Sequence, residues 1–375
     1  MKHAERAHAL ISPSALSRII ACPGSVALCE GLPEVRSEAA DTGTKAHELL
    51  EGYLNGRQRA PRGSDPAMVK VIRPIVDWVT KLAADRKLEI IPEMPVPAGE
   101  MLYPDNPEVC WGTADVVLHN EKELIVLDLK YGVTPVAAKD NPQLLAYALG
   151  ALTAIGDTGQ KITVGILQPR TAGPMHEFWE PEDEEVEEFL DAASNAIELA
   201  LQALEGVATP ALIPGDEQCR WCRAAATCPA LKKKALEPFE DLTKNKVEES
   251  DEATLADILS RKKLLLALLD AVETQALERA LSGSKIPGFK LVESVTRRTW
   301  VDYGALLDEL EACQLPMDKL APPTLVSPAQ AEKLVPKAQQ AVLSRFITKP
   351  KGKPTLAPES DKRPPLGISD FEAIN

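Results

Sequence analysis

The sequence predicts an α/β protein, because short apolar runs typical of buried strands alternate with longer stretches of helical periodicity. The run 124–127 contains only apolar residues and ends at an aspartate. The stretch 67–84 instead spaces its apolar residues so that they share one face of a helix. The strands expected from such runs are 89–96, 112–119, 124–129 and 161–168.

The N-terminal part is expected to be helical. Ser12 is a suitable N-cap, and Pro13 suits the first position of a helix. A turn at residues 22–24, Cys-Pro-Gly, interrupts this first helical stretch. The helices expected before the first strand are 12–30, 43–54 and 67–84.

The second half of the chain continues the alternation. Asn141 and Pro142 mark the start of a helix that carries Gln143 and Tyr147. A helix over 183–204 has an acidic first turn, which complements the helix dipole and is expected to face solvent. A long helix over 253–281 and a strand-like stretch over 289–301 follow.

Composition excludes several classes of protein. The chain has 375 residues, of which 45% are hydrophobic and 4% aromatic, so its core must be largely aliphatic. A formal charge of −14 argues against a protein that coats nucleic acid, although a local basic groove stays compatible with it. We expect a cytoplasmic protein with no membrane association, because no apolar stretch is long enough to span a bilayer and the start lacks a secretory signal.

The most informative pattern is a pair of aspartates with a lysine. Asp128 and Lys130 follow the apolar run 124–127, and residues two apart on a strand point to the same face. Asp115 follows a glycine turn thirteen residues earlier. Two carboxylates can hold Mg²⁺ or Mn²⁺, and an amine can stabilise an attacked phosphate. The alternative is a surface ion pair at a strand end.

Three further groups strengthen the metal interpretation. His47 lies on an expected helix upstream and offers an imidazole nitrogen to a metal, the alternative being a structural histidine. Gln143 and Tyr147 are four residues apart and share a helix face, where an amide and a phenol could contact phosphate or Lys130. Glu93 is a weaker candidate for a further acid, because a solvent-facing strand residue is the simpler interpretation.

Cysteines suggest a second site. Cys219, Cys222 and Cys228 follow a C-x₂-C-x₅-C spacing, which is unusual for core residues of a cytosolic protein. Cys22 is the best fourth ligand because Cys22-Pro23 repeats the Cys-Pro pair at 228, and Cys29 is its rival. The residues by themselves leave [4Fe–4S] and Zn²⁺ open.

The order of these motifs resembles the RecB-like branch of the PD-(D/E)xK nuclease superfamily, in the iron–sulfur form found in CRISPR-adaptation nucleases and the AddB helicase-nuclease subunit. The match covers residues 10–230, and the whole chain also resembles a family of phage and prophage proteins. The motifs that carry it are Ser12-Pro13-Ser14, Cys22-Pro23, His47, Gly112-Thr113-Ala114-Asp115, Asp128-Leu129-Lys130, Gln143 with Tyr147, and the three-cysteine segment.

The resemblance implies a restriction-endonuclease-like fold, a central mixed sheet flanked by helices. The region after residue 235 has no counterpart in that pattern, and we expect it to be a largely helical C-terminal extension. The resemblance implies metal ligation by His47, Asp115 and Asp128, a catalytic Lys130, and Gln143 and Tyr147 near the substrate. It also implies a [4Fe–4S] cluster on Cys22, Cys219, Cys222 and Cys228, with Zn²⁺ as the alternative. The domains expected are a nuclease domain at 1–235, an extension at 236–347 and a disordered basic, proline-rich tail at 348–375.

The expected function is therefore a Mg²⁺- or Mn²⁺-dependent DNA nuclease, an exonuclease on single strands or duplex ends, that serves phage replication or recombination in a bacterial host. Its expected partners are DNA and phage or host replication and recombination proteins. The alternative is a nuclease fold that binds DNA or a partner with little catalysis of its own. A DNA-degradation assay with either metal distinguishes the two.

Overall fold

The computed structural model shows two compact units, which are described separately. Unit 1 comprises Met1–Ala60 and Met68–Ala271, and unit 2 comprises Pro61–Ala67 and Val272–Asn375. The residues that the structure describes are 9–32, 38–61, 64–156, 159–171, 173–242, 251–296, 298–300, 303–315, 317–320, 327–352 and 354–366.

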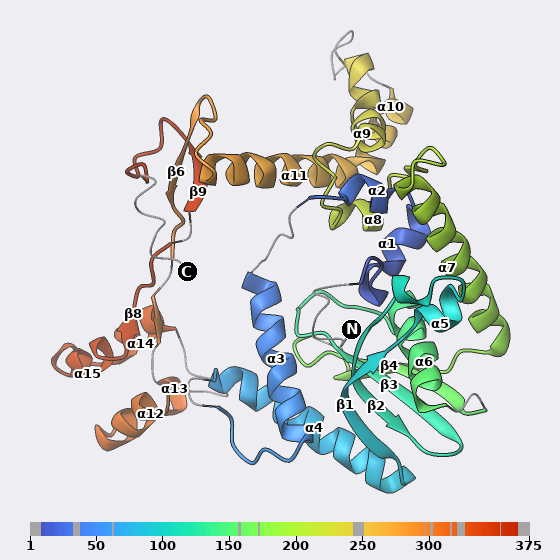
Figure 1. Ribbon diagram of the computed structural model, residues 1–375. Helices are drawn as coiled ribbons and strands as arrows, with labels where there is room; N and C mark the ends of the chain where they lie inside the picture. The colour runs from blue at the N-terminus through green and yellow to red at the C-terminus, as the bar shows by residue number, and fades with distance from the viewer. Residues whose placement is uncertain are drawn as a thin grey trace. The chain divides into compact units, whose positions relative to one another are not determined.

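A five-stranded mixed sheet forms the centre of unit 1, as the fold class predicted (Figure 1). Its order is β1-β2-β3-β4-β5, and only β3 and β4 run parallel. A parallel pair needs a crossover, which the helix α6 (Pro142–Ile155) supplies. The strands are β1 (Glu89–Val96), β2 (Gly112–His119), β3 (Glu123–Leu129), β4 (Lys161–Leu167) and the short edge strand β5 (His176–Trp179), which the sequence did not indicate.

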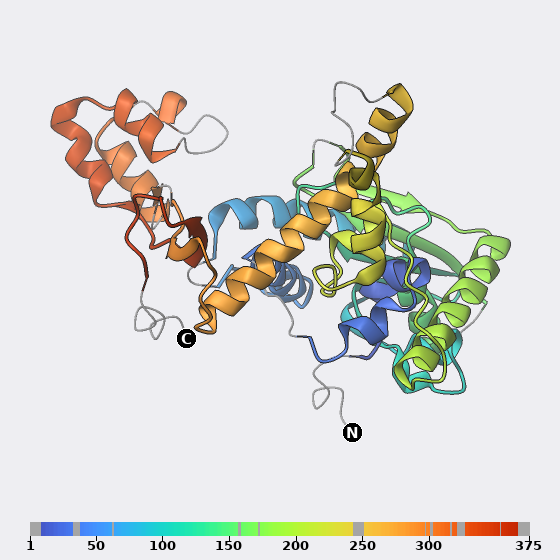
Figure 2. The ribbon, with the colours of Figure 1, turned by 90° about the horizontal axis from the view of Figure 1, so that it is seen from above.

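Helices cover both faces of the sheet. Leu124 and Val126 of β3 pack with α6 and with α7 (Asp183–Leu204), the long yellow-green helix of Figure 2. Ile125 and Leu127 point to the other face, where α3 (Glu38–Leu54) and α4 (Pro66–Arg86) complete a second core. The alternation follows from the two-residue period of a strand, so a continuous apolar run is buried on both sides.

Close packing of α6 depends on a glycine. A Cβ added at Gly150 would lie 2.9 Å from the Cβ of Val96 and 3.0 Å from the backbone nitrogen of Ala98. Neither neighbour is the flexible end of a side chain, so a larger residue would push the helix from the sheet. Asn141 caps the other end of α6, where its side chain accepts hydrogen bonds from the amides of Gln143 and Leu144.

The remaining elements of unit 1 are short or follow the sheet in sequence. The expected helix 12–30 is divided into η2 (Pro13–Ala15), α1 (Leu16–Ala21) and α2 (Ser25–Cys29), and the last two pack on α7. The expected helix 253–281 is broken at Arg261 into two helices. The other elements are α5 (Gly99–Leu102), η3 (Pro107–Val109), α8 (Asp216–Arg220), α9 (Pro229–Leu242), α10 (Glu252–Ser260) and α11 (Lys262–Leu281), the last of which continues into unit 2.

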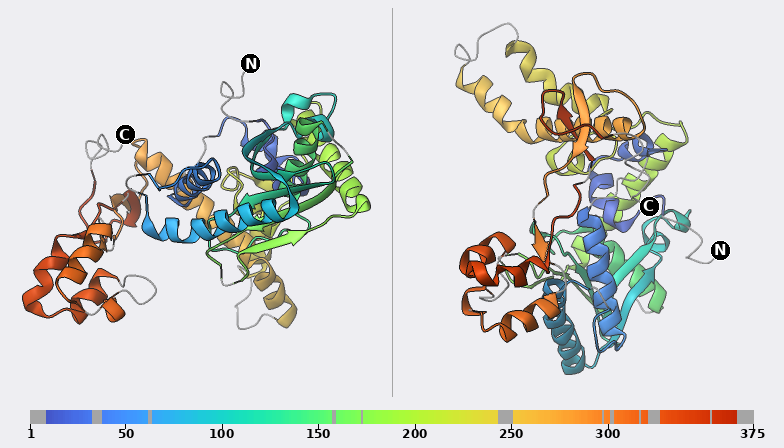
Figure 3. Two further views of the ribbon diagram at one scale, coloured as in Figure 1. Left: turned by 90° about the horizontal axis from the view of Figure 1, so that it is seen from below. Right: turned by 90° about the vertical axis from the view of Figure 1, so that its left-hand side faces the viewer.

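Unit 2 contains short helices and two small strand pairs, which are the orange and red elements of Figure 3. Strand β6 (Phe289–Glu293) pairs with β9 (Pro354–Pro358), and β7 (Thr299–Trp300) pairs with β8 (Ile347–Thr348). Between them lie α12 (Tyr303–Ala312), α13 (Met317–Leu320), α14 (Pro328–Leu334), η5 (Lys337–Gln339) and α15 (Gln340–Ser344).

The segment 348–375 was expected to be disordered, and for β9 this expectation is wrong. The strand pairs with β6 over five residues, and the amide of Glu359 donates to the carbonyl of Gly288. Local composition did not indicate this strand because its partner lies more than sixty residues earlier in the chain. Residues 367–375 lie outside the described residues. No helix in the described parts of the chain has the length and apolar character to cross a membrane.

Candidate metal centre

The candidate site lies where β2 and β3 separate. Their pairing runs from His119 opposite Leu124 to Val116 opposite Leu127 and is not continued beyond that point. The amide of Leu129 donates instead to Oδ2 of Asp115, at 2.6 Å. A buried amide needs such an acceptor, so the separation of the strands fixes the carboxylate of Asp115 at their end.

His47 reaches Asp115 from α3. Its Nδ1 lies 3.0 Å from Oδ1 of Asp115, and the His47 side chain is 31% exposed whereas that of Asp115 is 9% exposed. Burial lowers the pKa of His47, but the hydrogen bond to Asp115 and the charges of Asp115 and Asp128 outweigh it. The pKa therefore lies above its ordinary value of 6.5.

Glu93 faces the same carboxylate from β1. It lies between Pro92, paired with Val116, and Met94, paired with Ala114, and is therefore opposite Asp115 in register. Its φ is +48°, which is left-handed backbone within a strand. Such a conformation is unfavourable for a residue with a side chain and is often found at functional sites. Burial and the charge of Asp115 raise the pKa of Glu93 to about 7.

These three residues fit a single cation. His47, Glu93 and Asp115 each offer a ligand atom, and these atoms all lie within 4.8 Å of one another. Oxygen ligands of Mg²⁺ and Ca²⁺ lie about 2.0–2.6 Å from the ion, so two ligands of one ion are at most about 5 Å apart. Two carboxylates with one imidazole suit a divalent cation. Among the described residues, no other set of three or more acidic, histidine or cysteine ligands meets this criterion.

Asp128 and Lys130 form a second cluster beside the first. Oδ2 of Asp128 lies 2.8 Å from Nζ of Lys130, and the side chain of Asp128 is only 3% exposed. Gln143 donates from Nε2 to Oδ1 of Asp128 at 2.9 Å and accepts from Nζ of Lys130 at 2.8 Å. Its Nε2 also lies 3.1 Å from the hydroxyl of Tyr147. The amide of Gln143 thus fixes both members of the ion pair.

Electrostatics connect the two clusters. Burial raises the pKa of Asp128, an effect that the charge of Lys130 opposes and that of Asp115 reinforces. Burial and the charge of Asp128 also raise the pKa of Tyr147, so its hydroxyl stays protonated at neutral pH. The Lys130 side chain is 29% exposed, so it is partly accessible from solvent.

The loop between Lys130 and α6 is fixed by residues that the sequence did not indicate. Gln168 is 5% exposed, accepts from the amide of Val136 and donates to the carbonyl of Thr134. Arg170 donates to the carbonyl of Tyr131, and its guanidinium lies 4.7 Å from that ring. Both residues follow β4, which is parallel to β3, so the carboxyl ends of the two strands meet at this edge.

The structure thus brings all the predicted nuclease residues to one edge of the sheet. Glu93, which the sequence suggested only weakly, lies with His47 and Asp115 in the set of ligand atoms within 4.8 Å of one another. Asp128 lies outside this set and contacts Lys130 and Gln143 instead. The signal for Glu93 is its register opposite Asp115, which requires knowledge of strand pairing.

The predicted cluster cysteines also come together, although Cys22 is 197 residues before Cys219 in the chain. Cys22, Cys219, Cys222 and Cys228 all line one small, mostly apolar cavity with Leu212, Ile213 and Leu231. Cys29 does not line it, but its Sγ lies 3.8 Å from that of Cys222. The hydrogen bond from Cys222 lowers the pKa of Cys29 to about 6.

Comparison with known proteins assigns the family. The family described as "Protein of unknown function (DUF2800)" matches residues 8–364. The chain belongs to the DUF2800 family. A candidate exonuclease from Eubacterium rectale is 12% identical, with a TM-score of 0.37 over 54% of this chain and 83% of the other. LHK-Exo in complex with dAMP is 12% identical, with a TM-score of 0.25 over 52% of this DUF2800 chain and 94% of its own.

Proposed function

We propose that this DUF2800 protein is a Mg²⁺- or Mn²⁺-dependent deoxyribonuclease that degrades DNA from single strands or duplex ends. The observation that carries the proposal is the meeting of the cation group, His47, Glu93 and Asp115, with a buried aspartate–lysine pair at the same strand ends. A cation site beside a fixed, accessible amine suits attack on a phosphodiester.

Each residue has a role in this proposal. His47, Glu93 and Asp115 would hold the cation, with Asp128 beside them as the fourth candidate ligand. When bound, the cation would supply charge neutralisation at phosphorus and a more acidic water. Lys130, fixed by Gln143, donates hydrogen bonds to the attacked phosphate, and its charge opposes the rise in the pKa of Asp128 that burial causes. The Tyr147 hydroxyl holds the amide of Gln143.

The test is degradation of end-labelled single- and double-stranded DNA with Mn²⁺. We expect the wild-type protein to cut at least one DNA form and Asp128→Ala and Lys130→Ala to cut neither. A wild-type protein that cuts nothing with either metal, or variants that cut equally well, would end this proposal. Tight DNA binding without turnover, unaffected by Asp128→Ala, would favour the alternative of a nuclease fold that only binds DNA or a partner.

We further propose a [4Fe–4S] cluster on Cys22, Cys219, Cys222 and Cys228. The shared cavity supports a common ligand. Four thiolates on one zinc ion lie about 3.8 Å apart, because each is about 2.3 Å from the metal. Among the described residues no three of these sulfurs lie within 4.8 Å of one another. The choice of [4Fe–4S] over Zn²⁺ rests on the sequence resemblance.

The cluster has its own test. Anaerobically purified protein should absorb at about 400 nm and contain iron and sulfide, as iron–sulfur proteins do. Cys22→Ser should lose this absorbance, whereas Cys313→Ser in unit 2 should retain it. Zinc as the only metal would contradict the proposal. A role in phage DNA replication or recombination, in the cytoplasm of a bacterial host, stays a prediction from the sequence resemblance.

A further inference from the structure

The cysteine segment carries an unusual surface. Residues 218–235 contain five lysines and arginines and no acidic residue, in a chain with 42 basic and 56 acidic residues. The basic residues are Arg220, Arg223, Lys232, Lys233 and Lys234, and all five are exposed. The segment is therefore locally cationic on an acidic protein, a pattern typical of a local contact with a polyanion.

An exposed tryptophan lies within this segment. Trp221, between Cys219 and Cys222, is 77% exposed. The guanidinium of Arg220 lies 5.0 Å from its ring centroid. Tryptophan is usually well buried, so a large exposed indole calls for a functional explanation. The segment that carries Trp221 is anchored in the core, because Cys219, Ala225 and Leu231 are buried in one hydrophobic cluster.

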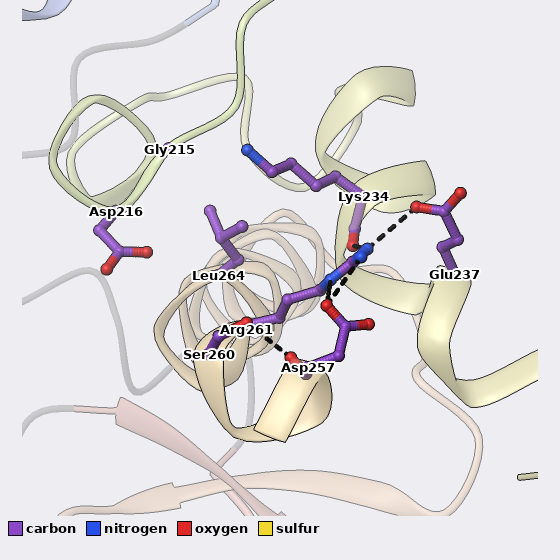
Figure 4. A pocket seen from close by; sticks show the side chains of 8 residues that line it. All are labelled: Gly215, Asp216, Lys234, Glu237, Asp257, Ser260, Arg261 and Leu264. Carbon is purple, nitrogen blue, oxygen red and sulfur yellow. Dashed lines mark hydrogen bonds and ion pairs between the residues drawn. The ribbon is translucent and has the colours of Figure 1, made fainter. Parts of the chain in front are cut away.

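The charges of this surface are largely available. Arg220, Lys232 and Lys233 form no ion pair with any acid among the described residues, and Lys234 donates to the neutral carbonyl of Pro214. The arginine that lines the adjacent pocket differs from these residues, because acidic side chains pair with it. Figure 4 shows Arg261 between Glu237 and Asp257, both within 3.1 Å of its nitrogens, so the charge of Arg261 is neutralised internally.

We propose that Trp221 and Arg220, with the other exposed cations of this segment, bind single-stranded DNA outside the catalytic site. Trp221 stacks on a base, and the surrounding cations contact the backbone phosphates. Stacking on an aromatic ring beside a cationic track is the general way in which proteins bind single strands without sequence preference. The inference rests on the proposed function, because DNA is the substrate there, and it adds a second contact for the strand being degraded.

The experiment measures binding separately from cleavage. Full-length Asp128→Ala protein is titrated into a fluorescent oligothymidylate of about 20 nucleotides in EDTA, followed by anisotropy. Adding Trp221→Ala should weaken binding about 5- to 150-fold, the range for loss of one stacked base. Trp221→Phe should restore most of the affinity, because it keeps an aromatic face. Arg220→Ala should lower the slope of log affinity against log salt by about 0.7.

The matched control is Phe289→Ala, which removes an aromatic side chain that is 47% exposed on β6. Equal affinity of the Trp221→Ala and Phe289→Ala proteins for DNA would overturn the inference. So would a Trp221→Ala protein that binds DNA as before but sediments differently in the absence of DNA, because that result indicates a protein partner. Unchanged thermal melting and absorbance near 400 nm show that Trp221→Ala leaves the fold and any cluster intact. If the wild-type protein cuts no DNA but binding still depends on Trp221, the proposed function fails and this inference stands.

Discussion

Glu93 offers the sharpest test of the cation site. The side chain lies opposite Asp115 on the neighbouring strand, with left-handed backbone that no turn requires. The substitution Glu93→Gln keeps the size of the side chain and removes its charge. If Glu93 is a ligand, Mn²⁺ affinity should fall. If it is only a strand residue, the substitution should leave Mn²⁺ affinity unchanged.

The magnitude follows from the geometry and the pKa. Loss of an outer-shell partner already costs about 10- to 100-fold in metal affinity, so loss of a direct ligand should cost at least about 10-fold. A carboxyl with a pKa of about 7 must lose its proton before it binds a cation. Its ionised fraction falls about 10-fold from about pH 8 to about pH 6, so wild-type affinity should fall by a similar factor. Glu93→Gln should show a shallower pH dependence.

Isothermal titration with Mn²⁺ at a series of pH values measures both effects. Titrations in two buffers with different ionisation enthalpies give the number of protons released on binding. Glu89→Gln is the matched control, because Glu89 lies on the same strand with a side chain that is 72% exposed. We expect the control to bind Mn²⁺ as the wild type does and Glu93→Gln to release fewer protons.

Thermal melting tests the raised pKa of Glu93 independently of metal binding. The pKa of Glu93 in the folded protein lies above its unfolded value of 4.5. Its contribution to stability is therefore fully present below pH 4.5 and is lost as the pH rises through about 7. His47, whose pKa is also raised, acts in the same direction. In EDTA, the advantage of Glu93→Gln in melting temperature over wild type should therefore grow from about pH 5 to about pH 8. Equal Mn²⁺ affinity and equal proton release in Glu93→Gln and wild type would refute the reasoning.

Four further substitutions test the surroundings of the site and the packing of its helices. Gln143→Leu removes the contacts that hold Lys130 and Asp128, so DNA cleavage should fall about 10- to 100-fold; cleavage at the wild-type rate would contradict the role in positioning. Gly150→Ala should lower the free energy of unfolding by about 1–3 kcal/mol in urea titrations, because its Cβ would meet β1. Gly43→Ala, with no atom within 4 Å of the added Cβ, should instead raise it by about 0.5–1 kcal/mol. Gln168→Ala should speed amide exchange over 131–141 and slow cleavage; unchanged exchange would show that Gln168 does not fix this loop.

Local signals gave most of the fold correctly. The strands β1, β2 and β3 and the helix α7 agree closely with the expected ranges, and α6 begins where expected, because burial and caps leave periodic apolar patterns in a few neighbouring residues. Strand β5 was missed because it has only four residues, with two exposed and two half-buried. Arg261 breaks the expected long helix, and its side chain pairs with Glu237 and Asp257.

The residues of the candidate site divide in the same way, into those that local sequence patterns indicate and those that only strand pairing places. Asp128 and Lys130 were found because they follow a buried run and share a strand face, which is a property of two residues and their neighbours. The position of Glu93 opposite Asp115 depends on strand register, which the alternation of apolar residues within one strand does not specify across a pair.

The sequence alone determined most strands and helices around the site, and which of them carry acids, an amine and thiols. Only the tertiary structure decided that β2 and β3 separate at Asp115, that Glu93 joins His47 there, and that Cys22 lines one cavity with cysteines almost two hundred residues later. The physical reason is the range of the interactions. Periodicity reflects the burial of neighbouring residues, whereas a site assembled from distant segments depends on strand pairing and packing that close long loops.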